Sequence, residues 1–160
     1  MVNYREEAVL TTAIVFVKNT FASPVHIPVL STDNLIEEVA RIRCTTYNEI
    51  FSDEIVPAER KFFSQIRHLV EEGRSMIIDR TNLRVKSRDR VLDLIPKEYV
   101  KIAYVMGNFS IDLFDKRNTR PGKIIPRGVV EDMIKNFQYP TKDEGFDLIY
   151  DIDVKKGLTL

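Results

Sequence analysis

The chain of 160 residues predicts a single α/β domain covering residues 1–160, with a three-layer sandwich and a mainly parallel sheet of four to five strands. Short apolar segments that fit buried strands alternate with longer segments whose apolar residues recur at helical spacing. Gly73, Pro96 and Pro140 separate these segments at the expected ends of helices. Strands that alternate with helices imply a parallel sheet that is covered on both faces.

The N-terminal segment fits either of two structures. β-branched residues favour a strand, and they are Thr11, Thr12, Ile14, Val15 and Val17. Apolar residues at helical spacing, with charged residues at both ends, fit a helix over residues 5–21 equally well. We expect the helix, because acidic residues in its first turn and Lys18 in its last turn suit the helix dipole.

The remaining elements follow in order. We expect a strand over residues 25–31 and a helix over 35–43. A polar loop over 45–53 precedes a helix that begins at Pro57 and ends at Gly73, a left-handed cap. Next come a strand over 75–79, a helix over 85–95 and a strand over 100–106. A helix over 110–119, a helix after Pro126 and a strand over 147–152 complete the chain.

Polar side chains follow the expected strands, and in parallel sheets ligands bind at the carboxyl ends of strands. Asp33 can accept a proton from a substrate hydroxyl, or it can cap the following helix. The turn that contains Asp79, Thr81 and Asn82 either satisfies its own amides or forms a polar shelf that faces a ligand.

Basic residues gather in two places. Lys116, Arg117, Arg120, Lys123 and Arg127 form a lid-like segment over residues 116–127 that suits a polyphosphate or a nucleic-acid backbone, or is a solvated face. A second set is scattered around one helix, which favours plain surface, and consists of Arg84, Lys86, Arg88 and Arg90.

Composition limits the remaining possibilities. Lysine plus arginine and aspartate plus glutamate each total 24, so no global charge draws the chain to nucleic acid or a membrane. The single Cys44 and the charged start predict a cytoplasmic protein with no membrane partner. His26 and His68 lack the spacing of metal ligands, so we expect no metal site in the protein itself.

In this order and spacing, several motifs together resemble the polynucleotide-kinase-type branch of the P-loop kinases. They run through about three quarters of the chain, and the main ones are Leu30-Ser31-Thr32-Asp33, Tyr47-Asn48-Glu49, Ile77-Ile78-Asp79-Arg80-Thr81-Asn82-Leu83, Lys86-Ser87-Arg88, Lys116-Arg117-Asn118, Arg120-Pro121-Gly122-Lys123, Ile125-Pro126 and Glu144-Gly145-Phe146-Asp147.

The resemblance implies roles for individual residues. Asp33 matches the carboxylate that activates the attacking hydroxyl, and Arg117 and Arg120 match lid arginines that clamp the donor phosphates. The implied substrate-binding residues are Asp79, Thr81, Asn82, Arg88 and Lys123. An intact relative transfers a phosphoryl group from ATP, with Mg²⁺, to the 5′-hydroxyl of a polynucleotide.

The chain departs from this family at its front, where residues 1–24 form a divergent segment. All six glycines lie at position 73 or later, so the glycine-rich phosphate loop and the strand before it are absent. That strand is the middle strand of the family's sheet. Its loss predicts that the sheet closes up, accepts an antiparallel strand or borrows a segment from a second chain.

Three functions remain open from the sequence. The first is a degenerate relative that transfers phosphate weakly or not at all and keeps a nucleotide-, nucleic-acid- or protein-binding role, with no cofactor. The second is an active kinase fragment that uses ATP and Mg²⁺ and whose phosphate loop is truncated or supplied by a partner. The third is a protein-interaction or structural module. We also expect a homo-oligomer with residues 8–17 at the interface, because this apolar segment has lost its usual neighbour.

Overall fold

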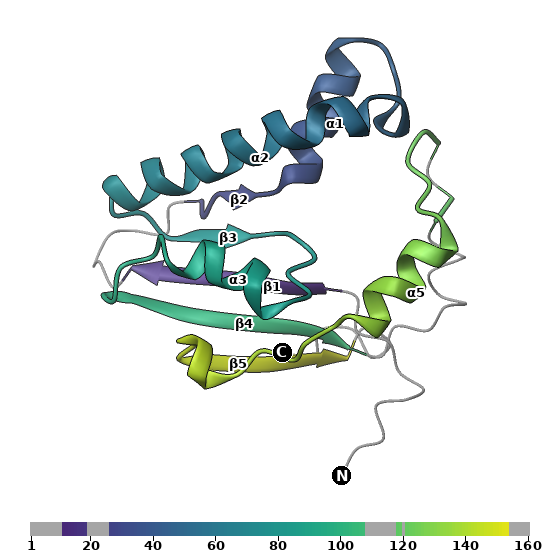
Figure 1. Ribbon diagram of the computed structural model, residues 1–160. Coiled ribbons are helices and arrows are strands. Elements are labelled where there is room, and N and C mark those ends of the chain that lie inside the picture. The colour runs from purple at the N-terminus through teal and green to yellow at the C-terminus, as the bar shows by residue number, and fades with distance from the viewer. Residues whose placement is uncertain (1–10, 19–25, 108–117, 120, 154–160) are drawn as a thin grey trace.

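The computed structural model of the chain describes residues 11–18, 26–107, 118–119 and 121–153 (Figure 1). Its elements in chain order are β1 (Thr11–Lys18), β2 (Val29–Leu30), α1 (Thr32–Ile42), α2 (Tyr47–Glu71), β3 (Met76–Ile78), α3 (Val85–Leu92), β4 (Tyr99–Gly107), α5 (Arg127–Lys135), the short 3₁₀ helix η1 (Lys142–Glu144) and β5 (Leu148–Asp153). The predicted α/β class is confirmed. The helix expected over residues 110–119 lies largely outside the described residues.

One five-stranded sheet has the order β2-β3-β1-β4-β5. β2 runs parallel to β3, and β4 runs parallel to β5. β1 lies between these two pairs and is antiparallel to both of its neighbours. The sheet is therefore mixed, and the prediction of a mainly parallel sheet is wrong.

The segment that we expected to be helical forms β1 instead. Its side chains alternate, since Ile14 and Phe16 are fully buried on one face while Val15 and Val17 are partly exposed on the other. β1 pairs with β4 along its whole length, from Thr11 opposite Met106 to Lys18 opposite Tyr99. An antiparallel strand thus fills the middle of the sheet, which is one of the three outcomes that the sequence left open.

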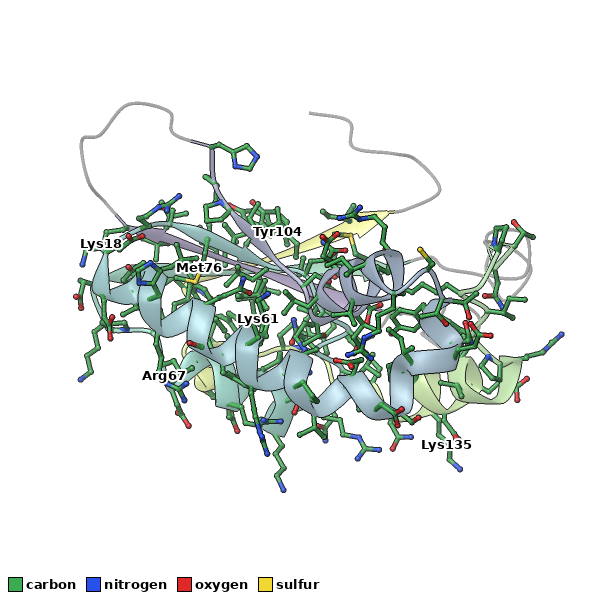
Figure 2. The ribbon with its side chains drawn as sticks, turned by 90° about the horizontal axis from the view of Figure 1, so that it is seen from above. Lys18, Lys61, Arg67, Met76, Tyr104 and Lys135 are labelled. Atoms are coloured by element: carbon green, nitrogen blue, oxygen red, sulfur yellow. The ribbon has the colours of Figure 1, made fainter. Side chains whose placement is uncertain are left out.

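The described helices lie on one side of the sheet (Figures 1 and 2). α2 and α3 pack on the inner face of the strands, and the shared core contains Ile14, Phe16, Phe62, Ile66, Met76, Ile78, Val91 and Ala103. α1 packs on α2 through a second apolar cluster that includes Ile36 and Ile50. Among the described residues we find no helix on the opposite face, so the three-layer arrangement is not found there.

Helix α2 begins earlier than the sequence suggested, because residues 47–53 are helical and not a loop. Thr46 caps the helix by accepting a hydrogen bond from the Glu49 amide, and the Glu49 carboxylate accepts one from the Thr46 amide. Hydrogen bonds from Thr45 and Thr46 lower the pKa of Glu49 to about 2. Pro57 lies inside the helix, and Gly73 ends it with the predicted left-handed conformation.

None of the helices in the described part of the chain is long and apolar enough to cross a lipid bilayer.

Candidate functional site

A cavity of about 600 Å³ opens beside the carboxyl ends of β2 and β3. The first turns of α1 and α2 form one side of it, and residues 121–126 (the 121–126 loop) and α5 form the other. Its polar lining includes Ser31, Thr32, Asp33, Glu37, Asn48, Asp79, Arg80, Thr81 and Lys123, and its apolar lining includes Phe51, Ile55, Ile125, Val129 and Met133. The arrangement combines an apolar wall with a polar end, as in most small-molecule sites.

Asp33 lies in the first turn of α1, directly at the cavity. Ser31 is the N-cap residue of this helix, since its side chain accepts a hydrogen bond from the Asn34 amide. The Asp33 carboxylate is therefore not the cap, and it is available for contacts across the cavity. Its Oδ1 accepts a hydrogen bond from Tyr47 Oη at 3.0 Å, and its Oδ2 accepts one from Lys123 Nζ at 2.9 Å.

Lys123 links the 121–126 loop to helix α1. Its ammonium group donates to Asp33 and to Glu37, and it lies 4.4 Å from the centre of the Tyr47 ring. The Lys123 side chain is only 10% exposed, whereas that of Asp33 is 50% exposed. One lysine therefore pairs with two carboxylates at the mouth of the cavity, and this contact links the loop to α1.

Tyr47 donates its hydroxyl proton to Asp33 as part of the same network. Burial of the phenol and the negative charge of Asp33 raise the pKa of Tyr47 far above its ordinary value. The phenol therefore stays protonated and remains a hydrogen-bond donor at every physiological pH.

Asn48 holds the 121–126 loop in place through three hydrogen bonds. Its side chain donates to the Ile124 carbonyl and accepts from the Ile124 amide, both at 2.9 Å, and its own amide donates to the Gly122 carbonyl. Asn118 closes the base of the loop by a similar pair of bonds to Ile125. Gly122 has a φ of 75°, and a Cβ atom there would lie 2.8 Å from the Thr46 side chain.

In the turn after β3, residues 79–81 line the cavity, whereas Asn82 makes a structural contact inside the protein. Asp79 and Thr81 line the cavity, together with Arg80, whose guanidinium pairs with Glu59 at 2.8 Å. Asn82 is buried, and its side chain donates to the Thr12 carbonyl at the start of β1. Asn82 therefore ties the turn to the middle strand and is not among the residues that line the cavity.

Arg88 is fully buried on α3, away from the cavity lining. Its guanidinium donates two hydrogen bonds to the Glu144 carboxylate, at 2.6 and 2.9 Å, and two more to the carbonyls of Asn82 and Gln138. The role implied for Arg88 in substrate binding does not fit this position, because all three guanidinium nitrogens donate hydrogen bonds within the protein. The expectation that Arg88 belongs to plain surface is likewise wrong.

The structure thus brings Asp33, Asp79, Thr81 and Lys123 around one cavity, as the sequence suggested. Arg117 and Arg120 lie outside the described residues. The roles of Tyr47, Asn48 and Glu37 were missed. The capping sequence from Thr46 to Glu49 is the signal that places Tyr47 and Asn48 in the first turn of a helix.

The residues at the cavity do not fit the ATP-binding apparatus of the P-loop kinases. That apparatus needs a glycine turn at the carboxyl end of the middle strand, where backbone amides surround the phosphates. The carboxyl end of β1 is Lys18, which pairs with Tyr99 at the start of β4. It therefore lies at the other end of the strands from the cavity, which is beside the carboxyl ends of β2 and β3. Within the described ranges, we find no group of three or more histidine, cysteine, aspartate or glutamate side chains arranged to hold a metal ion.

A scan against protein-family models gives no match to the chain, and a search of curated proteins also gives none.

Proposed function

We propose that this chain is a degenerate relative of the polynucleotide-kinase-type enzymes, which binds the 5′ end of a nucleic-acid strand in the cavity and transfers no phosphate. One observation carries the proposal. The cavity keeps its polar strand-end residues, Asp33, Asp79 and Thr81, while the middle strand of the sheet runs in the opposite direction.

The cavity lining supports binding of a terminal nucleoside. A volume of about 600 Å³ is within the usual range for a small-molecule site. Tyr47 and Phe51 offer aromatic surface for a base, with ring centres 5.4 Å apart, and aromatic stacking is the usual way in which proteins hold single-stranded ends. The Asp33 carboxylate, which is half exposed, can accept a hydrogen bond from a ribose or 5′ hydroxyl.

The charges at the mouth favour a hydroxyl end over a phosphorylated end. Asp33, Glu37 and Asp79 all line the cavity, and Lys123 is already paired with the first two. A terminal phosphate brings about two further negative charges to this position, at a cost in repulsion. A hydroxyl brings none and donates a hydrogen bond.

The absence of phosphoryl transfer follows from the same geometry. Catalysis of this reaction depends almost entirely on positioning the donor phosphates and stabilising their charge. Without a glycine cradle beside the cavity, we propose no ATP or Mg²⁺ as cofactor, and we expect ATP to bind more weakly than about 1 mM, or about −4 kcal/mol. We place this binding role in the cytoplasm, where the exposed thiol of Cys44 stays reduced.

Fluorescence anisotropy with a labelled oligonucleotide tests the proposal. We expect the 5′-hydroxyl form to bind about tenfold more tightly than the 5′-phosphate form, and Asp33→Asn to remove that preference. Asp93→Asn makes the same change at an exposed carboxylate, that of the residue that caps the C-terminus of α3, and serves as the matched control. Labelled phosphate that passes from ATP to the oligonucleotide, and stops passing in Asp33→Asn, would instead identify an active kinase.

A further inference from the structure

The face of the sheet that points away from the helices is apolar on all five strands. The side chains on this face, which we call the open face, are Val29, Ile77, Ala13, Val15, Val17, Val100, Ile102, Tyr104, Met106, Leu148, Tyr150 and Ile152, and each is partly or largely exposed. In Figure 2, Tyr104 lies on the side of the sheet opposite the helices. None of these side chains carries a charge.

Strand register joins these residues into a continuous apolar row. Val29 pairs with Ile77, Ile77 with Val15, Val15 with Ile102, and Ile102 with Leu148, so the row crosses the whole sheet. A second row joins Ala13, Tyr104 and Tyr150, and the two tyrosine rings stack with centres 5.4 Å apart. The antiparallel register of β1 is what places Val15 in the middle of the first row and Ala13 beside Tyr104 in the second.

A sheet face that meets water normally carries polar side chains, because each strand alternates between the core and the solvent. Here the side chains of the open face are apolar instead, and Val29, Leu148 and Tyr150 are 48%, 40% and 46% exposed. Contiguous exposed apolar patches of more than a few hundred Å² mark interaction sites. The open face is therefore built to be covered.

The size of the open face follows from the number and spacing of its strands. With strands about 4.8 Å apart and about six residues of 3.3 Å each, the face measures roughly 24 by 20 Å, or about 480 Å² in projection.

We propose that the open face is a homodimer interface, in which it packs against the open face of a second copy of this chain. Two sheets pack face to face about 10 Å apart through apolar side chains of this kind. A two-fold axis brings identical surfaces together, and the uncharged face meets its copy without repulsion between like charges. The chain as a whole has a formal net charge of zero, so no long-range repulsion opposes the association.

The size of the face sets the expected strength of the dimer. A standard interface buries roughly 800 Å² on each partner, and the projected area of the open face is already more than half of this value. The accessible area is larger than the projected area, because the side chains protrude from the sheet. We therefore expect a reversible dimer with a dissociation constant in the micromolar range, formed independently of any ligand in the cavity.

Sedimentation equilibrium of the full chain, from low to high micromolar concentration, tests this interface. We expect a monomer–dimer equilibrium for the natural sequence. Val29→Lys and Leu148→Lys add a charge at opposite ends of the row, at positions exposed enough to keep the monomer folded, and together they should weaken the dimer about 100-fold or more. Val56→Lys makes the same change at a 53% exposed position on α2 and should leave the dimer unchanged.

Two sedimentation results would overturn the proposed interface. One is a natural chain that stays monomeric at every concentration. The other is a dimer that the two open-face lysines weaken no more than Val56→Lys does. The melting temperature of the natural chain gives a second test, which does not depend on whether the variants fold. If the chain dimerises, this melting temperature rises with protein concentration. A melting temperature that does not change with concentration would count against the dimer.

Discussion

The ammonium group of Lys123 and the carboxylate of Asp33 lie 2.9 Å apart at the mouth of the cavity, although 90 residues separate them in sequence. Because Lys123 also contacts Glu37 and the Tyr47 ring, this side chain links the 121–126 loop to both α1 and α2. The pair joins a predicted catalytic carboxylate to a predicted substrate-binding lysine. It is therefore the first place to test the proposed site.

We expect Lys123→Met to weaken oligonucleotide binding about tenfold or more, because the Asp33 carboxylate then loses its cation and repels the phosphate backbone. Fluorescence anisotropy measures the effect. Lys61→Met removes the same charge from the exposed surface of α2 and is the control. Equal affinities of the two variants would show that the ligand binds elsewhere.

Gly122→Ala and Gly73→Ala form a second matched pair. Both glycines have positive φ, but only at position 122 does an added Cβ meet another side chain, at 2.8 Å from Thr46. We expect Gly73→Ala to lower the free energy of unfolding by about 1–2 kcal/mol and to leave binding unchanged. Gly122→Ala should also release the 121–126 loop and weaken binding. Hydrogen exchange at the Ile124 amide, which donates to Asn48, measures this release.

Arg88 and Glu144 form a buried ion pair, with side chains 0% and 6% exposed. We expect Arg88→Met to lower the free energy of unfolding by about 3–5 kcal/mol, because it leaves the Glu144 carboxylate buried without its partner. Urea denaturation measures the loss. If the variant keeps its stability and loses only ligand binding, Arg88 has the substrate-binding role that the family resemblance implies.

The capping box of α2 gives the protein a defined pH dependence. The pKa of Glu49 is about 2 in the folded protein, against an ordinary value of 4.5, so the folded state favours the ionised carboxylate. This contribution to stability is complete above about pH 4.5 and is lost as the pH falls toward 2. In Glu49→Gln we expect a smaller drop in melting temperature between pH 5 and pH 3 than in the natural chain. Calorimetry of both proteins at the two pH values tests this prediction. Equal drops in the melting temperatures of Glu49→Gln and the natural chain would contradict it.

The sequence predicted most elements from local patterns. α3, α5, β3, β4 and β5 lie within a few residues of their expected positions, because periodic apolar residues and proline or glycine breaks define them. β1 is a strand and not the expected helix, because the β-branched residues of the segment itself outweigh the charges of residues 5–7, which precede the strand. The strand direction cannot be read from local sequence, as it depends on which neighbours the strand joins.

The candidate site was predicted in part for a similar reason. Asp33, Asp79 and Thr81 follow strands, so the topology of the sheet brings them to one edge. The contacts of Arg88 with Glu144 join residues 56 positions apart, and no local pattern shows that a basic residue on α3 turns inward. The local pattern shows Lys123 as one member of a basic cluster, and the family resemblance implies that it binds substrate. Its pairing with Asp33 comes from the docking of the 121–126 loop on Asn48.

The most direct test of the central claim compares the affinity of the natural chain for one oligonucleotide with a 5′-hydroxyl and with a 5′-phosphate, in the absence of ATP. The account predicts that the hydroxyl form binds about tenfold more tightly, because Asp33, Glu37 and Asp79 accept a hydroxyl and repel a phosphate. Equal affinities, or no binding of either form, would contradict it.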